Sequence, residues 1–504
     1  MSVINTLHQH ATHNSEKIAI VGSQGENITF GQLYACVICL GEYFDKEIET
    51  LTFKNDRPRI CIFINDAFVN VFTVLGLNSI GAELVTLNPK LKAPQVAAFF
   101  DFTDADLAFT DDAGEALLSG SGVPIINIIK KTEEIINQKN KISMKTRKKK
   151  QNSAYDDDSP FIITLSSGST GEPKPVIITE RNKIDRTAQA VSLYGVSSKD
   201  VILNASPFFH SLGQRLTFVP ILTGATLVLL EKFSVSRWIN AVESHGVTFT
   251  IAVSSHLHAL ADILCSGHRL GDLRAIVSSS AGISTEVKKK LFKQKHFFFY
   301  EMYGATEVAT ATNQDGIQAG LAIDSVGKPC EGVEVVIYDK NSERCATGEI
   351  GEICVKSKLS SPGYLNSPVK TDASFRNGFF RTGDLGYLDE NNFLFLRGRQ
   401  TDLIISGGLN IFPQDVEGII ATHPSVIEVE VTGKPDNYLG EITVAVIATK
   451  ISPGRIEPEL RSLLRSKLAS YQQPGLYIFV DQLPYQANGK RDKQAIKRLV
   501  MAKD

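Results

Sequence analysis

The chain has 504 residues, more than one hydrophobic core usually serves, so two or more domains are expected. The hydrophobic share of 43% and charged share of 21% are typical of a soluble globular protein, and the net charge of −2 favours neither a nucleic-acid partner nor an acidic surface. We find no stretch long enough to span a membrane and no secretory signal pattern at the polar start, so membrane insertion is not expected. The seven cysteines form an odd, scattered set, which indicates reduced thiols in a cytoplasmic protein.

In chain order, the first elements are apolar, β-branched runs at 18–21, 59–64 and 82–87, which predict strands. Helix-length segments separate them, and this alternation predicts α/β layers. A charged stretch at 126–150 ends in a basic run, 145–150, and an acidic run follows soon after; such mixed charge is typical of a solvated loop. Short strands punctuated by glycine between 327 and 397 predict a β-rich subdomain, and the pattern after residue 399 changes to compact α+β.

The stretch 166–174 combines hydroxyls, glycines and one lysine, a composition suited to a polyphosphate such as that of ATP. Runs of β-branched residues at 162–165 and 176–179 predict that this loop joins two strands, whereas a Walker loop opens a helix. The alternative is an ordinary Ser/Gly turn. The phosphate-binding candidates are Ser166, Ser167, Gly168, Ser169, Thr170, Gly171 and Lys174.

Three further clusters follow. In 303–307 an aromatic ring can stack on a base, a threonine can donate to a phosphate, and a glutamate is a hard oxygen ligand suited to magnesium; the alternative is a strand end with a buried tyrosine. In 379–384 an aspartate beside a glycine turn can accept both hydroxyls of a ribose or can simply cap the turn. Near the C-terminus, Lys490 follows an Asn-Gly turn, although a lone terminal lysine is usually surface charge.

With these clusters in place, the chain resembles the adenylate-forming superfamily over almost its entire length. That superfamily includes acyl-CoA synthetases, adenylation domains of peptide synthetases, and luciferases. Further matching segments are 207–213, 348–353, 363–366 and 398–408, running on to Pro413 and Glu417. The resemblance implies the adenylate-forming ligase fold, an α/β architecture. A large N-terminal AMP-binding domain over 1–399 would hold layered α/β sheets and the β-rich subdomain, and a small mobile α+β C-terminal domain would cover 400–504.

The resemblance also implies roles for individual residues. Tyr303 would stack on adenine, with Gly304 beside it. Asp384 and Arg399 would bind the ribose. Ser280, Ala281 and Gly282 stand in the adenine-wall segment, where the family more often has glycines. The implied catalytic residues are Lys490, Thr306 at the α-phosphate, Glu307 as a magnesium ligand, and His210.

The reaction implied by the resemblance begins when a carboxylate attacks the α-phosphate of ATP. Two anions repel each other and pyrophosphate must leave, so the protein must supply positive charge. Lys490 would neutralise the attacking carboxylate and the α-phosphate, while Mg²⁺ and the loop would stabilise pyrophosphate. In the family the C-terminal domain then rotates, here about Gln400 and Thr401, and a thiol attacks the acyl-adenylate. The expected cofactors are ATP and Mg²⁺, with CoA as co-substrate.

The acid is expected to be a small-molecule carboxylic acid. By resemblance the acyl pocket is lined by His210, Ser211, Leu212, Ile251, Ser279, Met302, Gly304 and Ala309. Amino-acid-activating relatives place an aspartate in the segment that here reads 208–210, without a carboxylate. This difference disfavours an α-amino acid and favours an apolar or cyclic carboxylic acid. A lone histidine such as His210 is more often structural, but its place in this motif favours a functional role.

Three hypotheses for the function remain. The leading one is an acid ligase that ends in a thioester on CoA. The second is an amide-forming ligase of the coronafacic acid ligase type, because Thr401, at a pivot that is usually charged, is β-branched and adopts fewer backbone conformations. The third is an inactive nucleotide-binding scaffold, against which the retention of Lys174, Glu307, Asp384 and Lys490 argues. A monomer or homodimer is expected.

Overall fold

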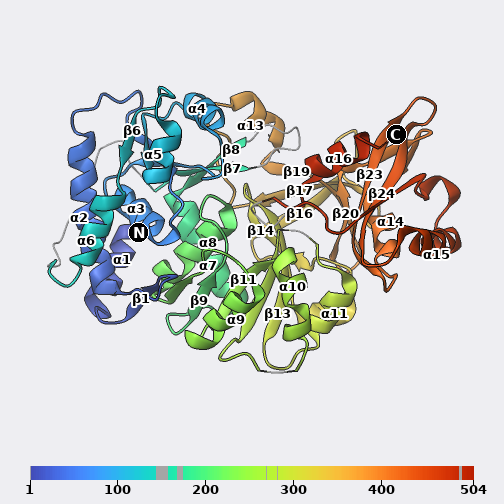
Figure 1. The fold of residues 1–504 in the computed structure, drawn as a ribbon, viewed down its shortest axis with the longest axis horizontal. Helices are drawn as coiled ribbons and strands as arrows, with labels where there is room; N and C mark the ends of the chain where they lie inside the picture. Colours follow the sequence, from blue (N-terminus) through green and yellow to red (C-terminus); the bar gives the residue numbers. More distant parts are fainter. Residues whose placement is uncertain are drawn as a thin grey trace.

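The computed structural model describes residues 2–142, 157–166, 174–267, 269–280, 282–486 and 491–503. A large N-terminal part makes up most of the long axis, and a smaller C-terminal part lies at one end of it (Figure 1). In the described ranges no helix combines the length and the apolar character needed to cross a membrane. The seven cysteines are free, in agreement with the expectation of unpaired thiols.

A nine-stranded sheet forms the middle of the N-terminal part, in the order β15-β14-β13-β12-β11-β9-β10-β1-β2. The strands from β13 to β1 in this order are parallel, and antiparallel strands close both edges. The strands are β1 (Ile18–Val21), β2 (Asn27–Thr29), β9 (Val201–Asn204), β10 (Thr226–Leu229), β11 (Phe249–Val253), β12 (Ala275–Ser279), β13 (Phe298–Ala305), β14 (Ala309–Gln314) and β15 (Lys328–Pro329). The helices between them are α7 (Glu180–Tyr194), α8 (Ser211–Thr223), α9 (Val235–Ser244), α10 (Ser254–Leu264), α11 (Thr285–Phe292) and α12 (Gly316–Leu321).

A six-stranded sheet lies beside it, in the order β6-β5-β3-β4-β7-β8, and it is parallel except for β8. The strands are β3 (Arg59–Phe63), β4 (Glu83–Thr86), β5 (Leu107–Thr110), β6 (Ile125–Asn127), β7 (Pro160–Ser166) and β8 (Lys174–Thr179). The helices are α1 (Val3–His13), α2 (Phe30–Ile48), α3 (Ala67–Ser79), α4 (Ala93–Phe102), α5 (Asp112–Leu118) and α6 (Ile129–Asn137). The largest apolar cluster includes Phe44 of α2, Ile60 of β3 and Phe218 of α8, so the layers share one core.

Two five-stranded sheets complete the molecule. The first contains β16 (Val333–Tyr338), β17 (Gly351–Ser357), β18 (Phe375–Arg376), β19 (Phe379–Leu388) and β20 (Leu394–Arg399), with α13 (Pro368–Ser374) before β18. The second contains β21 (Ile404–Ser406), β22 (Leu409–Ile411), β23 (Val426–Asp436), β24 (Gly440–Thr449) and β25 (Leu476–Val480). The second sheet carries α14 (Pro413–Ile420), α15 (Pro453–Lys467) and α16 (Lys493–Met501) at the end of the molecule that holds the C-terminus (Figure 1).

The fold class predicted from the sequence is confirmed. The runs at 18–21, 59–64 and 82–87 form β1, β3 and β4, and the segment 327–397 forms a β-rich unit. The basic run 145–150 lies outside the described residues. Between β20 and β21 stands a short 3₁₀ helix, η1 (Gln400–Asp402), and another, η2 (Ser470–Gln472), follows α15. The sheet that ends at Arg399 and the sheet that begins at Ile404 are therefore separated by only a few residues.

Candidate active site

The predicted phosphate loop connects two adjacent antiparallel strands. β7 ends at Ser166 and β8 begins at Lys174, and these two residues pair directly in the ladder. The Ser166 hydroxyl lies 3.5 Å from the Lys174 carbonyl oxygen. The remaining candidates of this loop lie outside the described residues: Ser167, Gly168, Ser169, Thr170 and Gly171. The strand–loop–strand arrangement is the one that the flanking β-branched runs predict, and it differs from a Walker loop, which opens a helix.

A buried tyrosine joins the base of this loop to the carboxylate predicted to bind magnesium. The Tyr364 hydroxyl donates to Glu307 Oε1 at 3.0 Å, and the two residues are 4% and 6% exposed. Lys174 Nζ lies 5.3 Å from the centre of the same tyrosine ring. Burial and the charge of Glu307 raise the pKa of Tyr364, so its hydroxyl stays a donor at neutral pH. The hydrogen bond fixes one oxygen of the Glu307 carboxylate.

An arginine from α7 fixes the turn that carries Thr306 and Glu307. Arg186 Nη1 donates to the Thr306 carbonyl oxygen at 3.0 Å, and Nη2 donates to the Leu359 carbonyl oxygen at 2.9 Å. Burial and the neighbouring Arg215 lower the pKa of Arg186 to about 9, while Glu307 acts in the opposite direction. At neutral pH this side chain is therefore charged. It ties the turn after β13 to the segment that follows β17.

The predicted adenosine residues lie together at the opposite end of the same segment. The Tyr303 hydroxyl donates to Asp384 Oδ2 at 2.8 Å, and Arg399 Nε donates to Asp384 Oδ1 at 3.1 Å. Asp384 and Arg399 face each other across β19 and β20. Burial, and after it the charge of Asp384, raises the pKa of Tyr303, so this phenol also remains a donor. One carboxylate thus receives hydrogen bonds from an aromatic hydroxyl and from a guanidinium group.

Gly304 allows the β13–β14 hairpin to close between these two groups. The register shifts between Tyr303 and Gly304, and the ladder continues with Gly304 opposite Thr310. A Cβ at position 304 would collide with the carbonyl oxygen of Ala309, so a larger residue cannot occupy this backbone. Ala309 itself has φ of +62°, in the left-handed region. The exposed Gly304 therefore marks a place where close approach of two backbones, rather than a side chain, shapes the surface.

The predicted acyl-pocket residues on the strands occupy three neighbouring positions in the sheet. Ile251 lies within β11 at 2% exposure, and Ser279 ends β12 at 8% exposure. Met302, within β13, is half-buried. Ligands of parallel α/β sheets bind beyond the carboxyl ends of the strands. Ser279 and Met302 lie closer to that edge than Ile251, which packs in an apolar cluster beneath α8.

The predicted adenine wall follows β12 directly. Ser280 is exposed and has φ of +78°, a conformation that non-glycine residues rarely adopt. Gly282 is exposed, and Ala281 lies outside the described residues. A strained backbone at the end of a parallel strand is a frequent feature of ligand sites.

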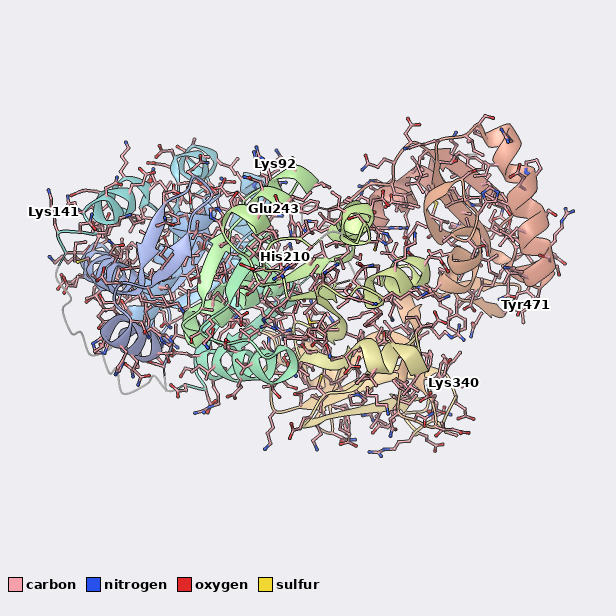
Figure 2. The ribbon with its side chains drawn as sticks, turned by 90° about the horizontal axis from the view of Figure 1, so that it is seen from below. Lys92, Lys141, His210, Glu243, Lys340 and Tyr471 are labelled. Atoms are coloured by element: carbon pink, nitrogen blue, oxygen red, sulfur yellow. The ribbon has the colours of Figure 1, made fainter. Side chains whose placement is uncertain are left out.

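His210 is the residue immediately before α8. Its carbonyl oxygen accepts from the backbone N–H of Gln214 at 3.0 Å, and its ring centre lies 4.3 Å from that of Phe209. His210, Ser211 and Leu212 are all half-buried. Figure 2 shows His210 well inside the N-terminal part, far from Tyr471 in the C-terminal part. The helix start thus places the three predicted pocket residues of this motif on one turn of backbone.

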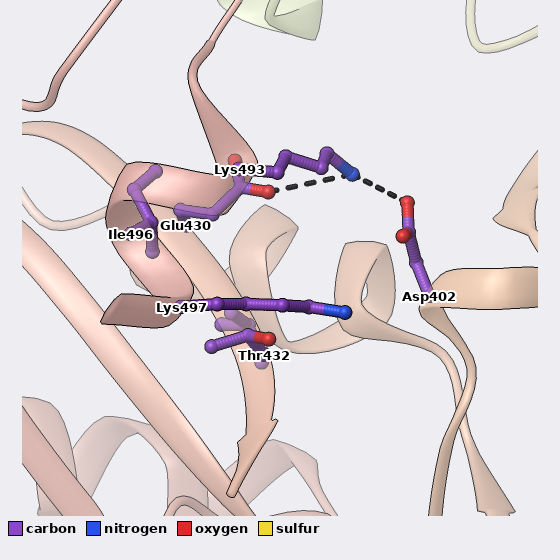
Figure 3. Close-up of a pocket in the computed structure, with 7 residues that line it drawn as sticks. Asp402, Glu430, Thr432, Lys493, Ile496 and Lys497 are labelled. Carbon is purple, nitrogen blue, oxygen red and sulfur yellow. Dashed lines mark hydrogen bonds and ion pairs between the residues drawn. The ribbon is translucent and has the colours of Figure 1, made fainter. Parts of the chain in front are cut away.

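The predicted hinge residues, Gln400 and Thr401, begin the short helix η1. The last residue of η1, Asp402, is bound by a side chain of the C-terminal part. Lys493 Nζ, at the start of α16, donates to Asp402 Oδ2 at 2.5 Å and lies 3.4 Å from Glu430 Oε1 (Figure 3). Gln400 and Thr401 are both exposed. Lys490 lies outside the described residues, three positions before Lys493.

Sequence reasoning assigned no role to Arg186 or Tyr364. Tyr364 lies in the matching segment 363–366, so its place in that motif could have indicated a role for its hydroxyl. Arg186 gave no signal, because a charged residue in a helix is expected to face solvent. The described residues contain no group of three or more His, Cys, Asp and Glu side chains placed to hold a metal ion. The ion expected at Glu307 would take its other ligands from phosphate and water, as Mg²⁺ commonly does.

Comparison with known proteins identifies the family. A model described as AMP-binding enzyme matches residues 7–365, and a model described as AMP-binding enzyme C-terminal domain matches residues 415–490. The 2-succinylbenzoate–CoA ligase of Bacillus velezensis is 30% identical, with 98% of each chain covered. The enzyme of the same name from Bacillus pumilus is 32% identical over 88% of this chain and 86% of its own length.

Solved structures give the same result. The o-succinylbenzoate CoA synthetase of Bacillus subtilis in complex with its acyl-adenylate intermediate superposes with a TM-score of 0.84, at 28% identity and 98% coverage of both chains. A double mutant of that enzyme bound to a product analogue superposes less well, with a TM-score of 0.70. An amide bond synthetase from Marinactinospora thermotolerans has a TM-score of 0.83 at 22% identity over 99% of this chain and 100% of its own, which is a likeness of fold alone. The chain therefore belongs to the AMP-binding enzyme family, and it is an AMP-forming acid ligase.

Proposed function

We propose that this chain joins a carboxylic acid to CoA through an acyl-adenylate, with ATP and Mg²⁺ as cofactors and with the chemistry centred on the segment 303–307. One observation carries the proposal. This short segment contacts Asp384 through Tyr303. At its other end Glu307 contacts the Tyr364 hydroxyl, and Lys174 Nζ lies 5.3 Å from the centre of that tyrosine ring. A nucleotide bound along the segment would have acceptors for its ribose at one end and positive charge for its phosphates at the other.

The roles of the described residues follow from their chemistry. Asp384, oriented by Tyr303 and Arg399, is suited to accept hydrogen bonds from the ribose hydroxyls. The Thr306 hydroxyl is suited to donate to the α-phosphate, and Lys174 offers a mobile cation at the mouth of the loop. The Tyr364 hydroxyl holds Glu307 Oε1, so the second oxygen of Glu307 is the one that would bind Mg²⁺. The bound ion would neutralise charge on the leaving pyrophosphate.

For the catalytic step, we propose that Lys490 supplies the positive charge that neutralises the attacking carboxylate and the α-phosphate. Hydrogen bonds hold residues on both sides of Lys490. Tyr485 donates to Glu428, and Arg491 donates to the Val429 carbonyl oxygen and to the Glu430 carboxylate. We further place the boundary between the two domains at 399/400 and the pivot at Gln400 and Thr401, because these exposed residues follow β20 and precede the residue held by Lys493.

We infer that the acceptor is CoA. The relatives that match over nearly the full length carry names of CoA ligases, and the amide-forming neighbour is similar in fold only. The amide-forming alternative is therefore not favoured. Free cysteines fit a reducing compartment, and we propose that the enzyme acts in the cytoplasm.

The test is pyrophosphate–ATP exchange across a panel of carboxylic acids, with 2-succinylbenzoate first because the relatives are named for it. Exchange should depend on the acid and on Mg²⁺, and it should collapse in Lys490→Ala. The neighbouring exposed Lys497→Ala serves as a control and should exchange normally. Full exchange by Lys490→Ala would refute the assigned role. Products formed with CoA or with amino acids, identified by mass, decide the acceptor.

A further inference from the structure

Three large apolar side chains are exposed where β13 begins, at the lower edge of the N-terminal part in Figure 1. Phe298, the first residue of β13, is 70% exposed, and Ile317 and Leu321 of α12 are 80% and 75% exposed. Among the described residues only two other large apolar side chains are exposed to this degree, Val369 on α13 and Tyr438 before β24. Single exposed apolar side chains are common, but three on neighbouring elements mark an interaction surface.

The sheet and the helix bring these three side chains to one place. β13 and β14 are antiparallel, so β14 ends beside the start of β13, and α12 packs against β13 there. Ile317 and Leu321 are four positions apart and therefore share one face of α12, while Ala319 on the other face is buried. We call Phe298, Ile317 and Leu321 the apolar rim.

Positive charge lies next to the apolar rim. The segment that leads from α11 into β13 carries Lys293, Lys295 and His296, and all three are exposed. Within the described residues neither lysine forms an ion pair with a carboxylate. Both charges are therefore available to a partner.

The carboxylates of the same region are engaged or lie further away. Asp315 is half-buried and caps the start of α12. Glu286 lies 3.6 Å from Lys289, and Asp324 accepts a hydrogen bond from Thr285 at 2.8 Å, at the start of α11 rather than at its end. The end of α11, which faces the apolar rim, therefore keeps a positive charge.

Exposed apolar side chains beside free lysines suit the surface of an anionic membrane. The apolar groups enter the boundary between headgroups and acyl chains, and each lysine near the surface strengthens binding by about fivefold. A second copy of the chain suits the apolar rim less well, because a two-fold interface pairs the same patch with itself and so gathers like charges.

We propose that the apolar rim, with Lys293 and Lys295, attaches the enzyme reversibly to an anionic lipid surface. Phe298 begins β13, whereas the predicted acid and nucleotide residues lie at the other ends of the strands: Ser279 ends β12, and Thr306 follows β13. Ligands of parallel sheets bind at those carboxyl ends. Attachment through the amino end of β13 would therefore leave the active site open to its substrates.

The test is sedimentation of the full-length protein with vesicles of phosphatidylcholine alone and with vesicles that also contain phosphatidylglycerol. The protein should bind the anionic vesicles about 10-fold or more tightly than the neutral ones, since two lysines contribute. Added salt should weaken this binding, because it screens the charges. Equal binding to both vesicles, or binding to neither, would overturn the inference. Self-association that depends on Phe298 without vesicle binding would also overturn it, because the partner would then be a second copy.

Paired variants separate the two contributions. Phe298→Ser with Ile317→Ser, and Lys293→Gln with Lys295→Gln, should each weaken binding to the anionic vesicles by about 10-fold or more. All these side chains are exposed, so thermal unfolding should stay at the wild-type temperature, which shows that the variants fold.

The matched controls are an exposed apolar residue and an exposed lysine elsewhere. Val369→Ser, on α13, and Lys340→Gln, labelled in Figure 2, should bind the vesicles as wild type does. Vesicle binding that survives in both paired variants would overturn the assignment to the apolar rim. An equal loss in the controls would do the same, because the binding would then not depend on this surface.

Discussion

Replacing Tyr364 by phenylalanine removes one hydroxyl and leaves the ring that packs near Lys174. The lost hydrogen bond, 3.0 Å long and buried, is made to a carboxylate. A hydrogen bond to a charged group contributes about 1.5–3 kcal/mol. If Glu307 binds Mg²⁺ in the transition state, kcat/KM for ATP falls by about 10- to 150-fold, at about 1.4 kcal/mol for each factor of ten.

The assay for Tyr364→Phe is pyrophosphate–ATP exchange at several Mg²⁺ concentrations. We expect the Mg²⁺ requirement to rise, because an unheld carboxylate must be ordered on binding, while the KM of the acid stays unchanged. Tyr338→Phe is the matched control, since that half-buried tyrosine belongs to β16, away from the segment 303–307. Wild-type kinetics at every Mg²⁺ concentration would refute the reasoning. A loss of thermal stability with unchanged kinetics would show that the hydrogen bond only supports the fold.

The remaining predictions concern three other residues. Asp384→Asn should raise the KM for ATP about tenfold or more, measured by exchange, because it removes the charge that Arg399 and the ribose share; an unchanged KM would contradict the assigned role. Gly304→Ala should unfold at lower temperature, by several degrees, because its Cβ meets the Ala309 carbonyl; normal melting would show that the hairpin can shift. Burial and a neighbouring carboxylate raise the pKa of Glu417 to about 7 from 4.5. The folded form therefore holds the proton more tightly, and the stability that protonation provides is full below 4.5 and lost as the pH rises through about 7. Glu417→Gln should thus be more stable than wild type by on the order of 2 kcal/mol at about pH 8 and nearly equal at about pH 5, in thermal or denaturant unfolding; equal differences at both pH values would contradict the shift.

Local patterns predicted the strands well. The β-branched runs on either side of the segment 166–174 form β7 and β8, because such residues suit a pleated and buried surface. The residues of the cluster 303–307 also lie close together, since groups so near in sequence remain close in any fold, and their roles stay predictions.

Long-range pairs could not be predicted in the same way. Tyr364 and Glu307 are separated by 57 positions, and Arg186 and Thr306 by 120. No local periodicity links such pairs, because the sheet order brings them together only after helices and strands have packed. The position of Arg215 could not be predicted for a related reason: its charge suggests solvent, and only the contact with Met302 shows that it faces the sheet.

The ion pairs of Lys493 with Asp402 and Glu430 have a mechanical consequence. They clamp the first residue after the exposed pair Gln400 and Thr401 to the last helix and to the long strand β23. In the proposed rotation, the C-terminal sheet and its helices would then move as one rigid body. The changes in backbone dihedral angles would be confined to Gln400 and Thr401. Loosening these ion pairs would let the C-terminal unit bend next to the proposed pivot, so that the lysine proposed for catalysis, Lys490, would act less efficiently even though no group at the reacting centre had changed.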